Sequence, residues 1–338
     1  MVPAPVGYPC SRKVPIMRIW HAALVLVTLV VIVAAVAVVM AYRSDIGAAR
    51  ARLAAYDVTR IETRSGPLAY AEAGTGPAVL MIHGSGGGYD QGLAMTRPLA
   101  ERGYRVIAPS RFGYPATPYP QDPSLQAQTD AYVDLLDALG LEDVVVMGGS
   151  AGAISAVAFA IDHPERTRAL VAVVPAIPIP GQAPVEPWSP LQEKLVRAAL
   201  RSDFLFWAAI TLFPDQVTEA VLATEPALVA AASEGEQARV AAILDAILPV
   251  SPRAEGLLHD TAGVSGISLD YAAVTVPTLA ISAEDDLYRT DEGARALAEA
   301  ASDAELIVFA DGGHVWVGRN ADLFDAIDAF IGGLDEAR

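Results

Sequence analysis

The sequence has very little cysteine and, over most of its length, few basic residues. Cys10 is the only cysteine among 338 residues, so the chain has no disulfide framework and no cysteine-based metal site. The formal net charge is −17, and residues 1–60 hold seven Lys or Arg against two Asp, so the acidic excess lies in the remainder. An acidic body repels the phosphate backbone, which excludes nucleic acid as a partner. We interpret the negative charge as a solvated surface.

A long uncharged run extends from Ala22 to Tyr42 and is rich in Leu, Val and Ala. Its length suits a helix that crosses a bilayer at about 1.5 Å per residue. We therefore expect an N-terminal tail over residues 1–21, a transmembrane anchor over 22–42 and a helical juxtamembrane linker over 43–56. A cleaved signal peptide is the alternative, because the triplets 35–37 and 39–41 have small residues at both ends.

Basic residues flank this run on both sides, with Arg12, Lys13 and Arg18 before it and Arg43, Arg50 and Arg52 after it. The balance favours neither orientation strongly. We expect a single-pass membrane protein whose body lies outside the cytoplasm. The arginines of the linker either contact anionic lipid headgroups or are solvated.

From residue 57 onward, short apolar segments alternate with helical patterns. The expected strands are Val58–Thr63, Leu68–Ala71, Ala78–Ile82, Arg105–Ala108, Val144–Met147, Ala169–Val174, Val276–Ser282 and Leu306–Phe309. The expected helices include segments near Gly92–Arg102, Leu125–Leu139 and Glu292–Ala301. This alternation predicts an α/β domain with a mostly parallel sheet flanked by helices, formed by residues 57–175 and 272–338.

The segment 176–271 has no convincing strand and is punctuated by proline. The prolines that divide its helical patterns are Pro178, Pro180, Pro184, Pro187, Pro190, Pro214, Pro249 and Pro252. We expect an inserted helical cap. Its most apolar stretch, Phe204–Phe213, is predicted to be cap core, with a pocket wall or a membrane-facing surface as alternatives.

A glycine-rich loop, His83-Gly84-Ser85-Gly86-Gly87-Gly88, follows the expected strand at residues 78–82. It lacks the Lys-Ser/Thr pair of a phosphate-binding P-loop. Such a loop leaves backbone N–H groups free to face an anion, although a plain turn is the alternative.

Another apolar strand ends in Gly148-Gly149-Ser150-Ala151-Gly152 and continues into an Ala-rich helix. This Gly-x-Ser-x-Gly pattern is typical of a nucleophile elbow, in which a serine occupies a strained strand-to-helix turn. Gly148 and Gly152 leave room for the turn because they have no side chain. The first amides of the helix, with its dipole, favour negative charge beside the serine. A flexible glycine-serine loop is the alternative.

Two later strands end in a carboxylate and a histidine. The strand at 276–282 leads into Glu284-Asp285-Asp286, and the strand at 306–309 leads into Gly312-Gly313-His314. Together with Ser150 they follow the chain order Ser, Asp, His of a hydrolase triad.

With these motifs in this order, residues 58–335 resemble a serine hydrolase of the α/β-hydrolase fold, with the helical cap inserted after the sixth strand. The resemblance implies that Ser150 is the nucleophile, His314 the base and Asp286 the acid, the family spacing favouring Asp286 over its neighbours Asp285 and Glu284. It also implies that the backbone N–H groups of Ser85 and Ala151 form the oxyanion hole. This chemistry needs no metal and no organic cofactor.

The remaining histidines are expected to have other roles. The resemblance implies a structural role for His83, and we expect His163 at the surface, His259 in the cap and His21 beside the membrane span.

The sequence departs from the common family pattern at Gly149, Ala151 and Ala283, which weakens any transfer of substrate class. A serine nucleophile argues against the epoxide-hydrolase and haloalkane-dehalogenase branches, which use aspartate there. We therefore predict a membrane-anchored, esterase-like hydrolase of small or medium carboxylic esters, and we expect its small-molecule substrate to be hydrophobic. The alternatives are a carbon–carbon bond hydrolase of ring-fission keto acids, suggested by the similar His-Gly-Ser-Gly loop, and a non-catalytic binding module of the same fold.

Overall fold

The computed structural model describes residues 16–179, 181, 189–263 and 267–336. The chain divides into two compact units, Met1–Gly47 and Ala48–Arg338. Several residues used in the sequence analysis lie outside the described residues, namely Cys10, Arg12, Lys13, Pro180, Pro184 and Pro187.

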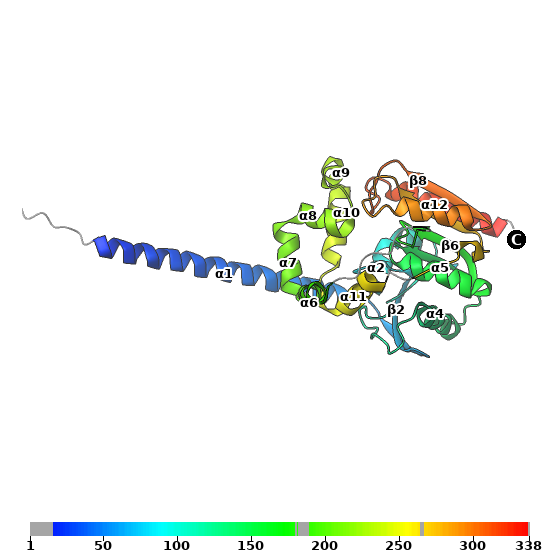
Figure 1. The fold of residues 1–338 in the computed structure, drawn as a ribbon, viewed down its shortest axis with the longest axis horizontal. Coiled ribbons are helices and arrows are strands. Elements are labelled where there is room, and N and C mark those ends of the chain that lie inside the picture. The colour runs from blue at the N-terminus through cyan, green and yellow to red at the C-terminus, as the bar shows by residue number, and fades with distance from the viewer. Residues whose placement is uncertain (1–15, 180, 182–188, 264–266, 337–338) are drawn as a thin grey trace, which may run out of the picture. The chain divides into compact units, whose positions relative to one another are not determined.

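The first unit holds most of one long helix, α1 (Ile16–Ala54), drawn in blue in Figure 1. Its part from Trp20 to Ala54 is long and apolar enough to cross a membrane, a test that an N-terminal signal sequence also passes. The helix begins at Ile16, so residues 16–21, expected as part of the tail, are helical because they continue the apolar pattern. It continues to Ala54 through the segment expected as the linker.

Two arginines in the last turns of α1 belong to the larger unit and bond to protein groups. Arg50 donates to the carboxylate of Asp203 at 3.2 Å. Arg52 donates to the backbone carbonyls of Asp245 at 2.8 Å and Leu248 at 3.2 Å. Both side chains remain exposed, so the cap supplies acceptors without removing the arginines from solvent, and contact with lipid headgroups stays a prediction.

The larger unit is built on an eight-stranded sheet in the order β1-β2-β4-β3-β5-β6-β7-β8. The strands are β1 (Thr59–Thr63), β2 (Gly66–Ala73), β3 (Ala78–Ile82), β4 (Arg105–Pro109), β5 (Val144–Gly149), β6 (Thr167–Val173), β7 (Thr278–Ala283) and β8 (Ala304–Phe309). The β1–β2 and β2–β4 pairs are antiparallel, and all other pairs are parallel. The carboxyl ends of β3, β5, β6, β7 and β8 therefore lie along one edge of the sheet.

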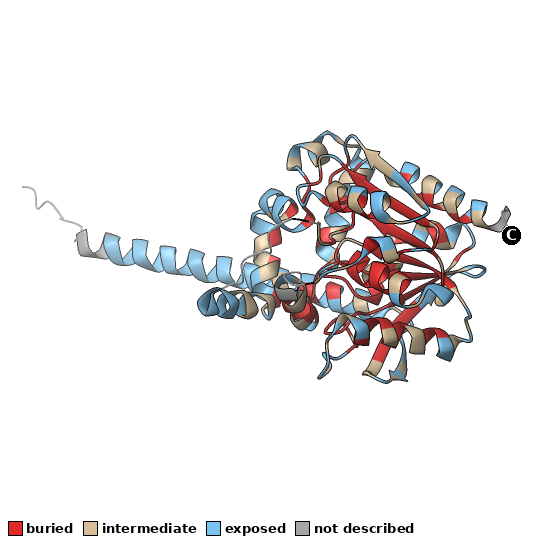
Figure 2. Cartoon of the chain, turned by 45° about the vertical axis from the view of Figure 1, so that its right-hand side comes forward, coloured by how far each residue is buried: buried red, intermediate tan, exposed pale blue. Residues whose placement is uncertain are grey.

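Helices cover both faces of this sheet. One face packs against α4 (Leu125–Leu139), α5 (Gly152–Asp162) and α12 (Thr290–Ala300), and the other against α3 (Arg97–Glu101) and α13 (Asn320–Glu336). Side chains alternate between the two cores, since Val144 and Val146 of β5 belong to one and Val145 and Met147 to the other. Figure 2 shows the resulting buried sheet in red. The predicted α/β-hydrolase architecture is confirmed.

The helix expected near Gly92–Arg102 is two helices, α2 (Tyr89–Met95) and α3. The break falls at Thr96, whose hydroxyl bonds to the carbonyl of Gly92, and Pro98 lies in the first turn of α3. Proline has no N–H to continue the preceding helix, so the pattern is interrupted here.

The cap between β6 and β7 is helical where it is described. Its helices are α6 (Pro190–Leu200), α7 (Asp203–Leu212), α8 (Pro214–Leu222), α9 (Pro226–Ala231), α10 (Glu234–Ala246) and α11 (Ala254–Gly263), with the short 3-10 helix η2 (Ser251–Arg253) before α11. Prolines open α6, α8 and α9, at a position where a missing N–H costs nothing. Only part of helix α7, which was expected to form the cap core, is buried. Trp207 and Ile210 are buried, while Phe204, Leu205 and Leu212 are exposed.

Candidate active site

Ser150 occupies a sharp turn between β5 and α5. Its φ is +52°, a left-handed conformation that is strained for a residue with a side chain. The turn is braced by its own backbone, because the Ser150 N–H donates to the Val173 carbonyl at 2.9 Å and its carbonyl accepts from the Ala153 N–H at 3.0 Å. The side chain is thus held at the carboxyl edge of the sheet.

Two glycines make the turn possible. A Cβ on Gly148 would lie 2.6 Å from the Ala156 Cβ and 2.7 Å from the Ala153 Cα. A Cβ on Gly152 would lie 2.3 Å from the carbonyl oxygen of Ile82 and 2.4 Å from that of His83. The helix after the turn therefore packs directly on β3 and the loop that follows it.

The structure brings Ser150, His314 and Asp286 into one hydrogen-bonded row. The Ser150 Oγ lies 2.9 Å from His314 Nε2, and His314 Nδ1 lies 2.8 Å from Asp286 Oδ2. A carboxylate can only accept, so Nδ1 carries the proton and Nε2 is free to accept the serine proton. The histidine and the aspartate are buried, which strengthens both hydrogen bonds.

The three neighbouring acids 284–286 have different surroundings. Asp286 accepts from the His314 ring, from the Thr290 hydroxyl and from the Tyr288 N–H. Asp285 accepts from the backbone N–H groups of Gly312 at 3.2 Å and Gly313 at 2.7 Å. The carboxylate beside the imidazole is therefore that of Asp286, while Asp285 fixes the backbone of the loop that carries the histidine.

The cap also reaches this histidine. The backbone N–H of His314 donates to the hydroxyl of Thr224, a cap residue, at 3.1 Å. The Tyr288 ring and the imidazole form a T-shaped contact, with 5.1 Å between ring centroids. Burial, together with the charge of Asp286, raises the pKa of Tyr288 above its ordinary value. Sequence analysis missed Thr224, since an isolated threonine in a cap has no motif.

The glycine-rich loop after β3 passes beside the serine. A Cβ on Gly84 would be 3.1 Å from the Ser150 Cβ. The amides around Ser85 are engaged, because Gly84 N–H donates to the Gln91 side chain and Gly86 N–H donates to the Tyr114 hydroxyl. Ala151, the second residue expected to donate to an oxyanion, is buried at the N-cap of α5.

The family model that describes the α/β hydrolase fold matches residues 77–317. This chain is a member of the α/β-hydrolase family.

Three relatives of this α/β hydrolase illustrate the breadth of the family. It is 39% identical over 106 residues to a 2-hydroxymuconate semialdehyde hydrolase of a Pseudomonas species, covering 30% of this chain and 37% of the relative. It is 30% identical over 184 residues to an epoxide hydrolase of Caballeronia sordidicola, covering 52% and 54% respectively. The matches thus span from about two fifths to about half of the curated relatives. A solved α/β hydrolase fold protein from Nakamurella multipartita superposes with a TM-score of 0.68 at 26% identity, covering 81% of this chain and 98% of that one.

Among the other histidines of this α/β hydrolase, His83 is fully buried and both ring nitrogens are engaged. Nδ1 lies 2.7 Å from the Gly84 carbonyl, so it carries the proton, and Nε2 accepts from the Arg111 N–H at 3.0 Å. Burial, and then the charge of Arg111, lowers the pKa of His83 well below its ordinary value. The neutral imidazole thus connects the glycine-rich loop to the loop that follows β4.

The remaining histidines lie outside the site. His163 was expected at the surface, but its ring packs on Phe159 with 5.2 Å between centroids and is largely buried. The apolar face of α5 continues to its C-terminal end and covers it. His259 lies in the cap helix α11 beside Tyr119, and His21 lies within α1. No group of three or more His, Cys, Asp or Glu among the described residues could hold a metal ion.

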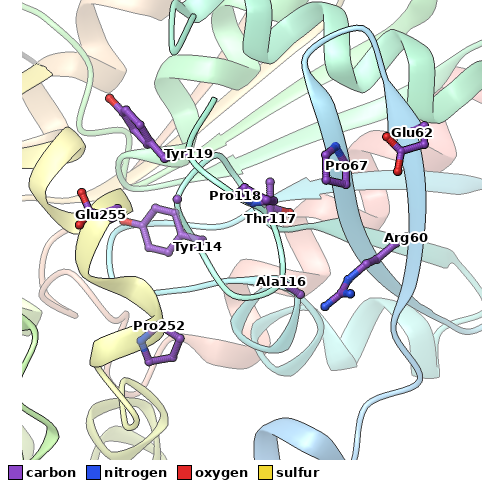
Figure 3. A pocket seen from close by; sticks show the side chains of 11 residues that line it. Arg60, Glu62, Pro67, Tyr114, Ala116, Thr117, Pro118, Tyr119, Pro252 and Glu255 are labelled. Carbon is purple, nitrogen blue, oxygen red and sulfur yellow. The ribbon is translucent and has the colours of Figure 1, made fainter. Parts of the chain in front are cut away.

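A separate groove of about 620 Å³ lies where the β1–β2 hairpin, the loop after β4 and the cap meet. Figure 3 shows Tyr114 and Tyr119 on the loop, Glu255 and Pro252 on the cap, and Arg60 on the hairpin. Ser150 and His314 do not line this groove, so the hydrogen-bonded row of Ser150, His314 and Asp286 lies elsewhere.

Proposed function

We propose that this α/β hydrolase is a serine hydrolase that cleaves carboxylic esters through an acyl-enzyme. The observation that carries the proposal is the continuous row from the Asp286 carboxylate through the His314 ring to the Ser150 hydroxyl. The left-handed turn at Ser150 and the glycines on either side of it add support, since they present the hydroxyl at the end of a strand.

The chemistry follows from these positions. The Ser150 oxygen attacks the ester carbonyl while its proton passes to His314 Nε2, and the Asp286 carboxylate stabilises the imidazolium that forms. The N–H groups of Ser85 and Ala151 hold the oxyanion, which the N-terminus of α5 also favours. The imidazolium then protonates the departing alcohol. Water, deprotonated by the same histidine, attacks the acyl-enzyme, and the histidine returns that proton to the Ser150 oxygen as the acid leaves.

A labelling experiment tests this function. The full-length protein in detergent is treated with a fluorophosphonate probe and assayed with p-nitrophenyl esters of increasing acyl length. We expect labelling and turnover in the wild type, their loss in Ser150→Ala, and their retention in Ser268→Ala, a matched change at an exposed serine.

Carbon–carbon bond hydrolysis is the second candidate, favoured by the 39% identity to the semialdehyde hydrolase. Cleavage of a vinylogous keto acid without cleavage of simple aryl esters would replace the ester proposal with this one. A folded wild type that neither labels nor turns over any of these substrates would leave a binding module of the same fold.

We also propose that α1 anchors the enzyme to a membrane, with the larger unit outside the cytoplasm and a hydrophobic ester as substrate. The support is the exposed apolar surface of α1 between Leu24 and Met40. Cys10, before the helix, provides a natural probe. In intact cells an impermeant maleimide should fail to label it and should label it after lysis, whereas a mature protein that begins after residue 37 or 41 would indicate a signal peptide.

A further inference from the structure

A buried carboxylate from the cap lies against the loop that carries Ser85. Asp260, on α11, has a side chain only 7% exposed. Its Oδ2 accepts from the Ser85 hydroxyl at 2.7 Å and from the Tyr114 hydroxyl at 2.5 Å. The two terminal nitrogens of Arg111 donate to its two oxygens at 2.7 and 2.6 Å. All four contacts join the cap to the core.

Each of the three partners of Asp260 touches the glycine-rich loop. Ser85 is part of it. Arg111 donates from its backbone N–H to the His83 ring and from Nε to the His83 carbonyl, both at 3.0 Å. Tyr114 accepts from the Gly86 N–H at 3.3 Å. One carboxylate therefore orients the groups that hold the loop before, at and after Ser85.

The charge of Asp260 is needed in this arrangement. Burial by itself would raise its pKa, but the charge of Arg111 and the hydrogen bonds from Arg111, Tyr114 and Ser85 keep the pKa below its ordinary value. Without the carboxylate, the guanidinium of Arg111 would stay buried without a counter-charge, which strongly disfavours the present geometry.

We propose that Asp260 is a positioning residue that fixes the oxyanion-binding loop from the cap. This inference rests on the proposed function, because it assigns a role to the loop in stabilising an oxyanion. The aspartate does not touch the reacting atoms. It sets the direction of the Ser85 N–H, and the hydrolase is therefore fully active only while α11 is docked on the core.

Asp260→Asn tests the role, because the amide keeps the shape of the side chain and removes its charge. We expect kcat for a p-nitrophenyl ester to fall by at least about tenfold and by no more than about a thousandfold, the upper end for complete loss of one oxyanion donor. KM should change by less than about threefold, because the oxyanion exists only in the transition state. The pH midpoint of kcat should not move, since the His314 and Asp286 pair is untouched.

Glu255→Gln is the matched control. It neutralises an acid on the same helix that pairs with Arg197 and Arg201 on the outside of the cap. Its kcat should stay near the wild-type value. Ser85→Ala removes only one of the four contacts to Asp260, and we expect a fall in kcat of at least threefold with KM unchanged. This variant decides the question if Asp260→Asn does not fold.

Amide hydrogen exchange of residues 83–88 gives a readout that does not depend on activity. It should be faster in Asp260→Asn than in the wild type and in Glu255→Gln. A folded Asp260→Asn with wild-type kcat and wild-type exchange would overturn the proposal, as would equal losses in Glu255→Gln. If the wild type itself cleaves no ester, the proposed function fails, and exchange alone then decides whether Asp260 holds the loop.

Discussion

The guanidinium of Arg253, which comes from the cap, lies 2.7 Å from the carboxylate of Asp90 in the core, with none of its side chain exposed to solvent. It also donates to the Gly87 carbonyl in the glycine-rich loop. In the second buried pair between cap and core the arginine, Arg111, belongs to the core and the aspartate, Asp260, to the cap. The cap segment 251–263 is thus joined to the core by two ion pairs, each next to the same loop.

Arg253→Met is expected to destabilise the protein by about 3–5 kcal/mol, because it leaves the Asp90 carboxylate buried without a counter-charge. Asp90→Asn in the same chain should recover part of this loss, so that the double variant is more stable than the sum of the single effects. Chemical denaturation of the full chain in detergent measures the free energies.

The control for that cycle is an exposed pair. Arg97 and Glu101 lie 3.3 Å apart on α3, with most of both side chains in solvent. Arg97→Met should cost less than about 1 kcal/mol. Equal effects of Arg97→Met and Arg253→Met would contradict the importance of the buried pair.

Gly152→Ala is expected to disrupt the turn at Ser150. Its Cβ would meet the backbone carbonyls of Ile82 and His83 at under 2.5 Å, and backbone cannot move aside cheaply. We expect a loss of about 1–3 kcal/mol in stability and a large loss of activity.

The neighbouring glycine is the matched control, because a Cβ on Gly149 meets only the flexible end of Met81, at 3.4 Å. Gly149→Ala should fold with nearly unchanged stability. A Gly152→Ala variant as stable and as active as Gly149→Ala would show that the turn has more room than its contacts indicate.

Asp286→Asn should lower kcat by about 10⁴-fold, because an amide no longer stabilises the imidazolium and can hold the ring in the wrong tautomer. Asp285→Asn, next in the chain, leaves the contact between Asp286 and His314 intact. It weakens only the bonds to Gly312 and Gly313, and we expect a loss below about tenfold. Steady-state kinetics with a p-nitrophenyl ester compares the two, and a larger effect of Asp285→Asn would reassign the acid.

Stability should fall as the pH drops below about 6.5, because of His83. Its pKa is lowered in the folded state, so between the two pKa values the unfolded chain binds a proton that the folded chain does not. The contribution is complete above the ordinary pKa of 6.5 and is lost on acidification at ~1.4 kcal/mol per pH unit.

Chemical denaturation between pH 5 and 8 measures this slope, and His83→Gln should reduce it. Burial also lowers the pKa of His259, so this residue contributes to the same pH dependence of stability. His259→Gln should remove that contribution separately. An unchanged slope in His83→Gln would contradict the neutral state of the His83 imidazole.

Local sequence patterns were sufficient to predict much of the fold. The helix expected at Leu125–Leu139 has these bounds in the structure, with Ser124 at its N-cap and Gly140 at its C-cap, and the strand before Ser150 begins as the expected apolar run. Such features depend on neighbours within a few residues, so sequence alone reveals them. The interruption at Thr96 was missed because a helical period continues across it.

The sequence by itself also predicted the nucleophile turn and the order serine, aspartate, histidine. These residues and the glycines at 148 and 152 stand at the ends of strands, where the local pattern marks them. The family spacing favoured Asp286 among three adjacent acids, but only the tertiary structure showed its carboxylate beside the imidazole, because that contact depends on the direction of a turn between two strand ends. The contacts of Asp260 with Ser85 and of Arg253 with Asp90 join residues more than 160 positions apart. Burial strengthens such pairs only once the cap has docked on the core, and no hydrophobic periodicity or motif spacing in the sequence predicts which residues will pair.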